Sequence, residues 1–278
     1  MLWFNAAVDR PAILAASDAN LAEFMCRMAN AEGAYSHEED GLVLVAANHP
    51  NPGPYRNAAV FTGDSTSLDG RLERALEFFA RRGRSFVLWV RDEGDAAAEV
   101  DHAAAGPGWR MLEDEGLPQL WREGPPEPVE PGEGITLTWA TNADTRRDFV
   151  RVNADAWGLE GAPFETAAQI FFEPDLLDDP SGTTFAVVAY LEGRPASTCL
   201  AIVHPGDVVG GYWGATAAWA LGHRLHDLTT RVAYNEAFAA FPQARVAVCQ
   251  NSPGAAKTIA RMGFEQVATW KRYLVPRP

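Results

Sequence analysis

A proline-rich segment divides the chain into two parts of similar length. The segment "EGPPEPVEPGEG", Glu123 to Gly134, carries four prolines and four glutamates. Such a composition cannot pack a hydrophobic core, and proline holds the backbone extended. The chain has 278 residues, which is long for one compact domain and sufficient for two. We therefore predict a domain at 1–122, a linker at 123–134 and a second domain at 135–278.

The composition is that of a globular protein with an acidic surface. Hydrophobic residues make up 47% of the chain and charged residues 22%, so each half can bury a core. The formal net charge of −14 argues against DNA and RNA binding through clustered Lys and Arg, and against an anionic membrane surface. No apolar run approaches the roughly 18 residues of a membrane-spanning helix. The first residues also lack the basic region of a signal peptide.

The cysteines and histidines do not predict a metal site. Cys26, Cys199 and Cys249 are far apart in the sequence and form no CxxC pair, which is untypical of a metal site or a disulfide framework. Reduced, buried thiols indicate a cytoplasmic protein. His223 and His226 are separated by two residues, and this spacing alone is a weak signal for a metal.

The first half is predicted to be a mixed α/β domain. Helices are predicted at "SDANLAEFMCRMANAEG", with Ser17 or Asp18 as its cap, at "TSLDGRLERALEFFARRG", which ends at Gly83, and at "DAAAEVDHAAA". Strands are predicted at "GLVLVAANH", "NAAVFTG", "SFVLWVRD" and "LPQLWRE".

The second half is predicted to run β-α-α-β-β-β-α-β-α-β from Ile135 to Val275. Asn142 or Asp144 can cap its first helix, and Ser252 can cap its last one. The three consecutive strands are "TTFAVVAYLEG", "RPASTCLAIVH" and "DVVGGYWGAT". The apolar stripe of the long helix that follows consists of Leu221, Leu225, Leu228 and Val232.

This order of elements resembles the GCN5-related N-acetyltransferase (GNAT) superfamily. Its most specific pieces are the strand-to-helix join at Thr216 to Leu228 and the closing stretch "QNSPGAAKTIARMGFEQVATWKRYLV". The resemblance covers Ile135 to Val275 and implies an α/β fold with a mixed sheet. The first half is similar to a shortened GNAT repeat without a phosphate loop, which makes a tandem arrangement. The resemblance implies an N-acyltransferase that uses acetyl-CoA, or another acyl-CoA, and a small amine acceptor.

The glycines of "VVGGYWGAT" support a strand that separates from its neighbour. Glycines inside a strand mark a bulge or a close backbone approach, and Gly210, Gly211 and Gly214 lie just before a helix. The alternative is that they relieve crowding from neighbouring aromatic side chains. By resemblance, the backbone of Gly214, Ala215 and Thr216 faces the pantetheine arm of coenzyme A.

The start of the long helix is where the family keeps its pyrophosphate loop, R/Q-x-x-G-x-G/A. One register places Leu221 at the Arg/Gln position, Arg224 at the first glycine and His226 at the second. The other places Trp219 at the Arg/Gln position, Gly222 at the first glycine and Arg224 at the second. Glycine is needed there because pyrophosphate lies almost on the backbone. The residues predicted to bind the cofactor are Gly214, Ala215, Thr216, Gly222, His223, Arg224, Leu225, His226 and Ser252.

Arg224 leaves three interpretations of this helix start open. The arginine can fill the phosphate site, or it can hold a phosphate by its guanidinium group. His223 and His226 add charge only when they are protonated. The third interpretation is an ordinary helix start with solvated basic residues.

The groups that would move protons are not identified by the sequence. The family tyrosine that protonates the departing thiolate corresponds to Ile259, which has no proton to give. The possible substitutes for the acid are Tyr212, Tyr234 and Tyr273. The acidic candidates for a base are Asp207, Glu165, Glu173 and Asp175.

Three functional hypotheses follow. The first is an N-acyltransferase that acts on a small amine. The second is a non-catalytic GNAT-like protein that binds a ligand or a partner, because both the loop and the tyrosine depart from the family pattern. The third is a GNAT-fold enzyme with a donor other than coenzyme A.

Overall fold

The computed structural model describes residues 9–31, 35–39, 41–47, 55–63, 68, 70–106, 108–170, 174–204 and 207–277. The first half contains α1 (Arg10–Ala31), β1 (Tyr35–Glu39), β2 (Leu42–Ala46), β3 (Asn57–Phe61), α2 (Arg71–Arg82), β4 (Phe86–Arg91), α3 (Gly94–Ala104), β5 (Arg110–Met111) and β6 (Leu117–Glu123). The second half contains β7 (Ile135–Trp139), α4 (Ala143–Ala156), α5 (Phe164–Ile170), η1 (Pro174–Leu177), β8 (Thr184–Leu191), β9 (Arg194–His204), β10 (Val208–Thr216), η2 (Ala218–Ala220), α6 (Leu225–Ala240), β11 (Val246–Gln250), α7 (Pro253–Ala260) and β12 (Glu265–Val275). Apart from the short 3₁₀ turns η1 and η2, the order predicted for the second half is confirmed.

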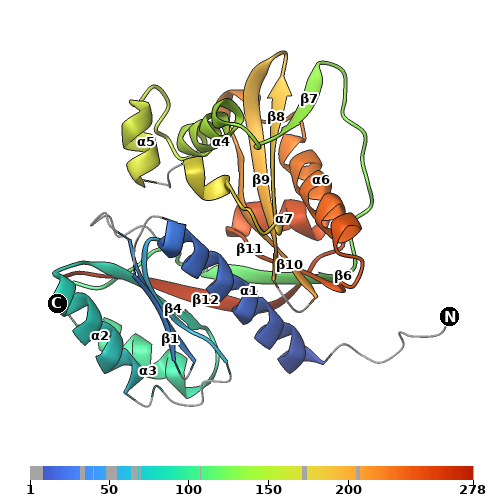
Figure 1. Ribbon diagram of the computed structural model, residues 1–278. Coiled ribbons are helices and arrows are strands. Elements are labelled where there is room, and N and C mark those ends of the chain that lie inside the picture. Colours follow the sequence, from blue (N-terminus) through green and yellow to red (C-terminus); the bar gives the residue numbers. More distant parts are fainter. Residues whose placement is uncertain are drawn as a thin grey trace.

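The two halves share one mixed sheet. Its order is β1-β2-β3-β4-β12-β6-β11-β10-β9-β8-β7, with β5 also paired to β12 (Figure 1). Strand β6 from the first half lies between β11 and β12 of the second half. Strand β12 in turn lies between β4 and β6 of the first half. The proline-rich segment therefore connects two parts whose strands are interleaved.

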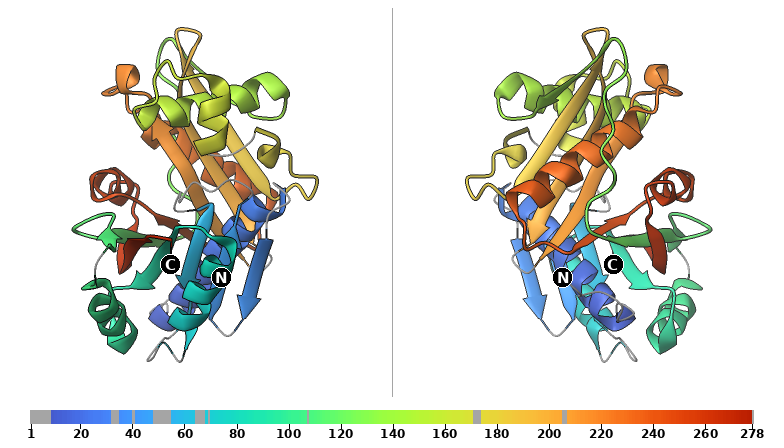
Figure 2. Two further views of the ribbon diagram at one scale, coloured as in Figure 1. Left: turned by 90° about the vertical axis from the view of Figure 1, so that its left-hand side faces the viewer. Right: turned by 90° about the vertical axis from the view of Figure 1, so that its right-hand side faces the viewer.

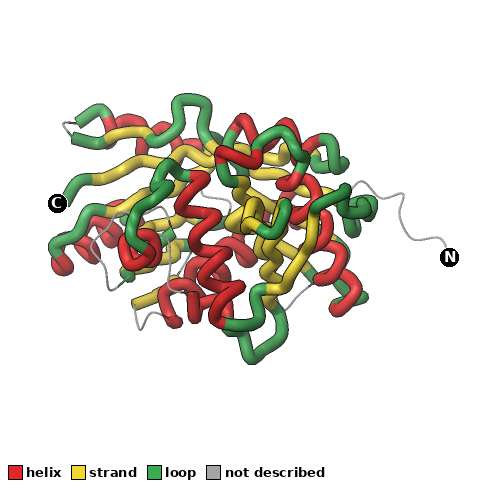
Figure 3. Tube along the Cα trace, turned by 90° about the horizontal axis from the view of Figure 1, so that it is seen from above, coloured by secondary structure: helices red, strands yellow, loops and turns green. Residues whose placement is uncertain are grey.

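Helices cover both faces of this sheet (Figures 2 and 3). The period-2 alternation of a strand decides which side chains each face receives. Val43 and Val45 of β2 pack in the cluster that contains α1 and α4, whereas Leu42 and Leu44 pack in the cluster that contains α2 and α3. In the second half, α6 and α7 pack on the face opposite to α4.

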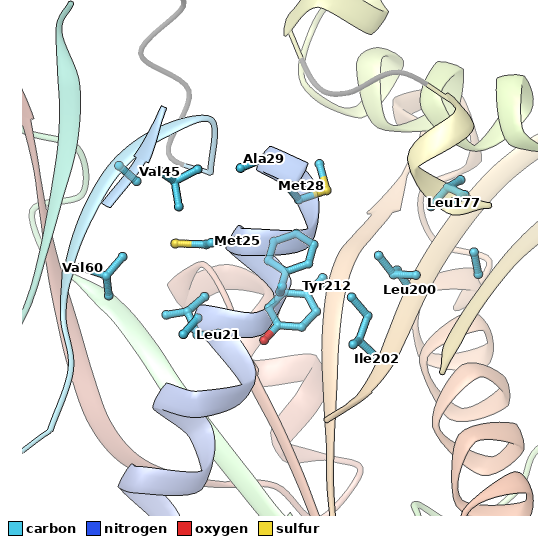
Figure 4. Close-up of a cluster of buried hydrophobic side chains, with 14 of the residues drawn as sticks. Leu21, Met25, Met28, Ala29, Val45, Val60, Leu177, Leu200, Ile202 and Tyr212 are labelled. Atoms are coloured by element: carbon cyan, nitrogen blue, oxygen red, sulfur yellow. The ribbon is translucent and has the colours of Figure 1, made fainter. Parts of the chain in front are cut away.

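Helix α1 lies at the centre of the molecule, between the strands of the two halves (Figure 4). On one side, Leu21 and Met25 approach Val45 and Val60 of the first half. On the other side, α1 packs against Leu200, Ile202 and Tyr212, which belong to β9 and β10. The ring of Phe24 stacks on that of Tyr212 with centroids 3.9 Å apart. One helix thus fills the space between both halves.

The predicted start of the first helix is wrong. Helix α1 begins at Arg10, so Ser17 and Asp18 lie within it rather than at its cap. Both side chains are buried and have partners elsewhere: Ser17 Oγ accepts from Gln250 Nε2, and Asp18 forms an ion pair with Arg91. Tertiary contacts, rather than local capping, explain why these polar residues are placed here.

The long second-half helix also starts later than its apolar stripe suggests. Helix α6 begins at Leu225, and the side chain of Leu221 is 66% exposed in the preceding loop. Other end signals are confirmed: Asn142 caps α4, Ser252 caps α7 and Gly83 ends α2. Strand β1 was not predicted, because its sequence "YSHEE" is polar and lies at the sheet edge.

Candidate active site

The neighbouring parallel strands β10 and β11 separate partway along their length. They pair from Val208 and Val246 as far as Gly211 and Cys249. Beyond that point β10 continues to Thr216 and β11 to Gln250. The predicted separation of this strand from its neighbour is therefore present in the structure.

Tyr234 of α6 lies where the two strands separate. Its hydroxyl donates a hydrogen bond to the carbonyl oxygen of Val248 at 2.6 Å. A Cβ on Gly211 would overlap the tyrosine ring and hydroxyl, so this position requires glycine. Burial raises the pKa of the Tyr234 hydroxyl well above its usual range. The tyrosine therefore stays neutral and closes the inner end of the gap.

A bulge in β10 follows directly. The register with β9 shifts between Tyr212 and Ala215, and Trp213 has a left-handed φ of 50°. The carbonyl of Trp213 accepts a hydrogen bond from Thr198 Oγ1 at 3.0 Å, and Asn153 Nδ2 donates to the same Thr198 oxygen at 3.0 Å. Helix α4 and strand β9 together fix the bulge.

The end of β10 has a backbone edge that faces the gap. The N–H of Ala217 donates to Ala196 O at 2.9 Å, and Ser197 Oγ donates to Ala215 O at 2.6 Å. The carbonyl of Ala215 and the N–H of Ala217 therefore point toward β9. Because backbone groups alternate along a strand, the N–H and C=O of Thr216 point the other way, toward the gap.

A cavity of about 420 Å³ occupies this region. Its walls come from β10, β11, α4, α6 and α7, and also from the first half, which supplies Tyr55, Arg56, Glu113 and Leu117. Trp157, at the end of α4, borders the cavity with its side chain 67% exposed. Both halves of the chain thus build one site.

His226 stands against the backbone of β10 at the cavity wall. A Cβ on Gly214 would lie 2.8 Å from His226 Nε2, closer than atoms of this kind normally approach. Burial lowers the pKa of the imidazole, although the carboxylate of Asp227 opposes this shift. The ring is therefore neutral near pH 7.

Arg224 points away from the gap. Its side chain is 80% exposed and donates to Asp227 Oδ2 at 2.9 Å. Asp227 also receives a hydrogen bond from Arg231 Nε at 2.8 Å. Arg224 is the N-cap residue of α6 with a left-handed φ of 57°, and its side chain makes no capping hydrogen bond. Arg224 therefore does not fill the space between the strands.

The residues predicted to bind the cofactor fall into two groups. Gly214, His226 and Ser252 line the cavity. Ala215 and Thr216 continue β10 beyond the cavity, while Gly222, His223 and Arg224 are exposed in the loop before α6. The side chain of Leu225 is buried against Ala189, Ala196 and Ala220.

The residues considered for the role of the acid differ in whether they line the cavity and in what their hydroxyl groups bind. Ile259 is buried and lines the cavity. Tyr212 also lines it, but its hydroxyl donates to Asn20 Oδ1 at 2.6 Å. Tyr273 lies in the first-half core, where its hydroxyl binds Asp101, and burial and that carboxylate raise its pKa.

None of the acidic candidates that the structure describes reaches the cavity. Glu165 and Asp175 are exposed, and Asp207 lies in the turn before β10, where its carbonyl accepts from Arg245 N. Glu173 lies outside the described residues.

Several cavity residues were not found from the sequence. Asn153, fully buried on α4, offers Oδ1 without a hydrogen-bond partner among the described residues. Its Nδ2 donates to Phe149 O at 3.0 Å, which fixes the orientation of the amide. Glu113 accepts from Arg272 Nε at 2.9 Å and joins β12 to the loop after β5. Only the fold brings these residues together, so no local sequence signal marks them.

The two cavity cysteines are unreactive in this environment. Burial raises the pKa of both Cys199 and Cys249 to about 12. A thiol of that kind is not an effective nucleophile at neutral pH. Within the described parts of the chain, no group of three or more His, Cys, Asp or Glu residues is placed to hold a metal.

The GNAT fold has a mixed sheet in which two central parallel strands separate, and a helix follows one of these strands. The sequence matches no protein-family model and no curated protein. Solved structures, however, share the fold over nearly the whole chain. A GCN5-related N-acetyltransferase from Kribbella flavida has a TM-score of 0.65 at 19% identity and covers 93% of this chain and 95% of its own.

Two further structures show the same arrangement. A tandem GNAT protein from the clavulanic acid biosynthesis pathway, solved without AcCoA, has a TM-score of 0.58 at 15% identity, with 95% of this chain and 97% of its own covered. A GCN5-related N-acetyltransferase from Sphaerobacter thermophilus has a TM-score of 0.57 at 15% identity, with 98% of each chain covered. The chain therefore has a tandem GNAT-like fold, as its sequence predicted.

Proposed function

We propose that the protein is an N-acyltransferase that transfers an acyl group from a thioester to a small amine, with the thioester arm between β10 and β11. The observation that carries this proposal is the separation of the two strands beyond Gly211 and Cys249, over a cavity of about 420 Å³. An extended arm can lie in that gap along Gly211 to Gly214 of β10, which line the cavity.

The fold implies acetyl-CoA or another acyl-CoA as the donor. The residues at the gap and at the start of α6 fit only part of that molecule. The gap between β10 and β11 suits a pantetheine arm. The start of α6 does not suit pyrophosphate, because the side chain of His226 lies against β10 where the backbone should be bare. When bound, the thioester supplies a carbonyl that an amine can attack.

The chain's own residues would orient the acceptor and exclude water. The buried Oδ1 of Asn153 can accept a hydrogen bond from the amine N–H. Thr198 holds the Trp213 carbonyl beside it, so the bulge keeps a fixed geometry. Tyr55, Tyr212 and Leu159 provide apolar walls that limit access of water.

A second candidate is a GNAT-like protein that binds a ligand without transferring a group. It is favoured by Ile259, which fills the position of the family acid with an apolar side chain. The hydroxyls of Tyr212 and Tyr234 are both committed to hydrogen bonds within the protein. Under the first candidate, the departing thiolate would therefore have to take its proton from water.

An assay of thiol release distinguishes the two candidates. Acetyl-CoA and S-acetylpantetheine are each incubated with the protein and a panel of primary amines, and calorimetry measures binding of each thioester alone. Thiol release that requires both the protein and an amine supports acyl transfer. Thioester binding without release supports the binding protein. No binding at millimolar thioester would contradict acyl transfer from either thioester.

We also place the proposed activity in the cytoplasm, with a small-molecule amine as partner and neither DNA nor a membrane. The free cysteines fit a reducing compartment. The net charge of −14 disfavours polyanionic partners. Among the described helices, none combines the length and the apolar character needed to cross a bilayer.

A further inference from the structure

We propose that His226 closes the cavity beside Gly214, so that the site takes a nucleotide-free acyl thioester, such as an acylated pantetheine arm, in preference to an intact acyl-CoA. This inference rests on the proposed function, since it concerns which thioester the same cavity accepts. It assigns donor selectivity to one residue of α6.

The first argument is steric. Gly214 has no side chain, but the space beside its Cα is already filled, because a Cβ there would be only 2.8 Å from His226 Nε2. A ligand carbon needs about 3.5–4.0 Å from each neighbouring heavy atom. An arm that continued along β10 toward the start of α6 would therefore have to displace the imidazole.

The second argument is the charge at the start of α6. The imidazole of His226 is neutral near pH 7 because burial lowers its pKa, so it offers no charge to a phosphate. The next residue, Asp227, is a buried carboxylate in the first turn. It binds both Arg224 and Arg231, and Arg231 also donates to Glu127 O at 2.6 Å. A diphosphate would have to compete with Asp227 for these guanidinium groups.

The third argument is the size of the space that remains. Small-molecule sites generally span about 300–1,000 Å³. The cavity, at about 420 Å³, lies toward the lower end of that range. Ser252, Ala255 and Ile259 of the α7 region line the cavity, whereas no residue from 215 to 225 does, so the space extends past the end of β11 rather than toward the exposed loop before α6.

Calorimetry with two thioesters tests the role of His226. S-acetylpantetheine and acetyl-CoA are titrated into the wild-type protein, His226→Ala and the control His102→Ala, an exposed histidine on α3 outside this cavity. We expect the wild-type protein to bind S-acetylpantetheine about tenfold more tightly than acetyl-CoA. His226→Ala should bring acetyl-CoA to the affinity of S-acetylpantetheine, whereas His102→Ala should leave both affinities unchanged. If His226→Ala does not fold, His226→Asn provides a smaller side chain at the same site.

The results separate this inference from the function on which it rests. Wild-type protein that binds acetyl-CoA as tightly as S-acetylpantetheine, or more tightly, would overturn the role of His226 and leave acyl transfer standing. The same holds if removing the imidazole changes both affinities equally. Failure of every variant to bind either thioester would overturn the proposed function together with the inference.

Discussion

The hydroxyl of Tyr212 donates a hydrogen bond to Oδ1 of Asn20 at 2.6 Å, in a fully enclosed contact between β10 and α1. The amide of Asn20 also donates to Ile202 O at 3.2 Å. One side chain of the first helix therefore binds both strands that form the bulged edge of the cavity. The site depends on a residue that is far from it in sequence.

Replacing Asn20 by Ala should destabilise the protein by about 1–3 kcal/mol, because the Tyr212 hydroxyl and the Ile202 carbonyl would lose their partner while still buried. Urea denaturation measures the change. Tyr212→Phe removes only the hydroxyl, so the double variant should be less destabilised than the sum of the two single variants. Strict additivity would show that the hydrogen bond contributes nothing.

Gly210→Ala should be more damaging than its small size suggests. A Cβ at Gly210 would overlap the Asn20 side chain, so α1 or β10 would have to move, at a cost of about 1–3 kcal/mol. Gly254→Ala is the matched control, since a Cβ there meets nothing and Gly254 lies within α7. The control should raise stability by about 0.5–1 kcal/mol. Equal melting temperatures for the two variants would contradict the predicted overlap.

The cysteines should differ in reactivity. At pH 8, Ellman's reagent should react first with the half-buried Cys26, whereas Cys199 and Cys249 should react only after unfolding. The reason is that burial raises the pKa of the latter two thiols to about 12. Mass spectrometry of the labelled peptides identifies which cysteine has reacted. Rapid labelling of all three cysteines in the folded protein would contradict the predicted difference in reactivity.

The same pKa shifts predict how stability depends on pH. A thiol with a raised folded-state pKa keeps its proton in the folded protein while the unfolded chain loses it. The free energy of unfolding should therefore fall as pH rises from about 9 toward 12, through the pKa of Cys199 and Cys249. Replacing Cys249 by Ala should make this decline shallower in denaturation curves. An unchanged slope would indicate that the thiol ionises equally in both states.

A chain that begins at Gly124 should not fold alone. It would lack β6, which pairs with both β11 and β12, and also α1, which packs on β9 and β10. We expect an unfolded or insoluble product by circular dichroism, and recovery of solubility when residues 1–123 are co-expressed. A cooperative melt of residues 124–278 alone would instead support the independent second domain predicted from the proline-rich segment.

The sequence predicted most of the second half because its signals are local. Asn142 and Ser252 act through nearby backbone groups, as does the stop at Gly83 in the first half, and each was recognised. Ser17 and Asp18 misled the prediction of α1 because their partners are Gln250 and Arg91, which local rules cannot anticipate.

Part of the cavity lining was predicted from backbone signals and from the resemblance. Gly214 was predicted because a glycine in a strand marks a close approach, and it lines the cavity together with His226 and Ser252. The sequence treated Arg224 and His226 as equal departures from the loop pattern, and only the structure shows that one points to solvent and the other lies against β10. Asn153 and Glu113 reach the cavity through the packing of α4 and the position of β12, so no spacing rule could assign them.

The position of β12 has a consequence for how the chain is made. Because β12 pairs with β4, β5 and β6, the first-half strands lack this neighbour until residues 265–275 have been synthesised. Contacts between residues so distant in sequence slow folding. The newly made first half would therefore expose unpaired strand edges on the ribosome, and the sheet would close only after β12 emerges.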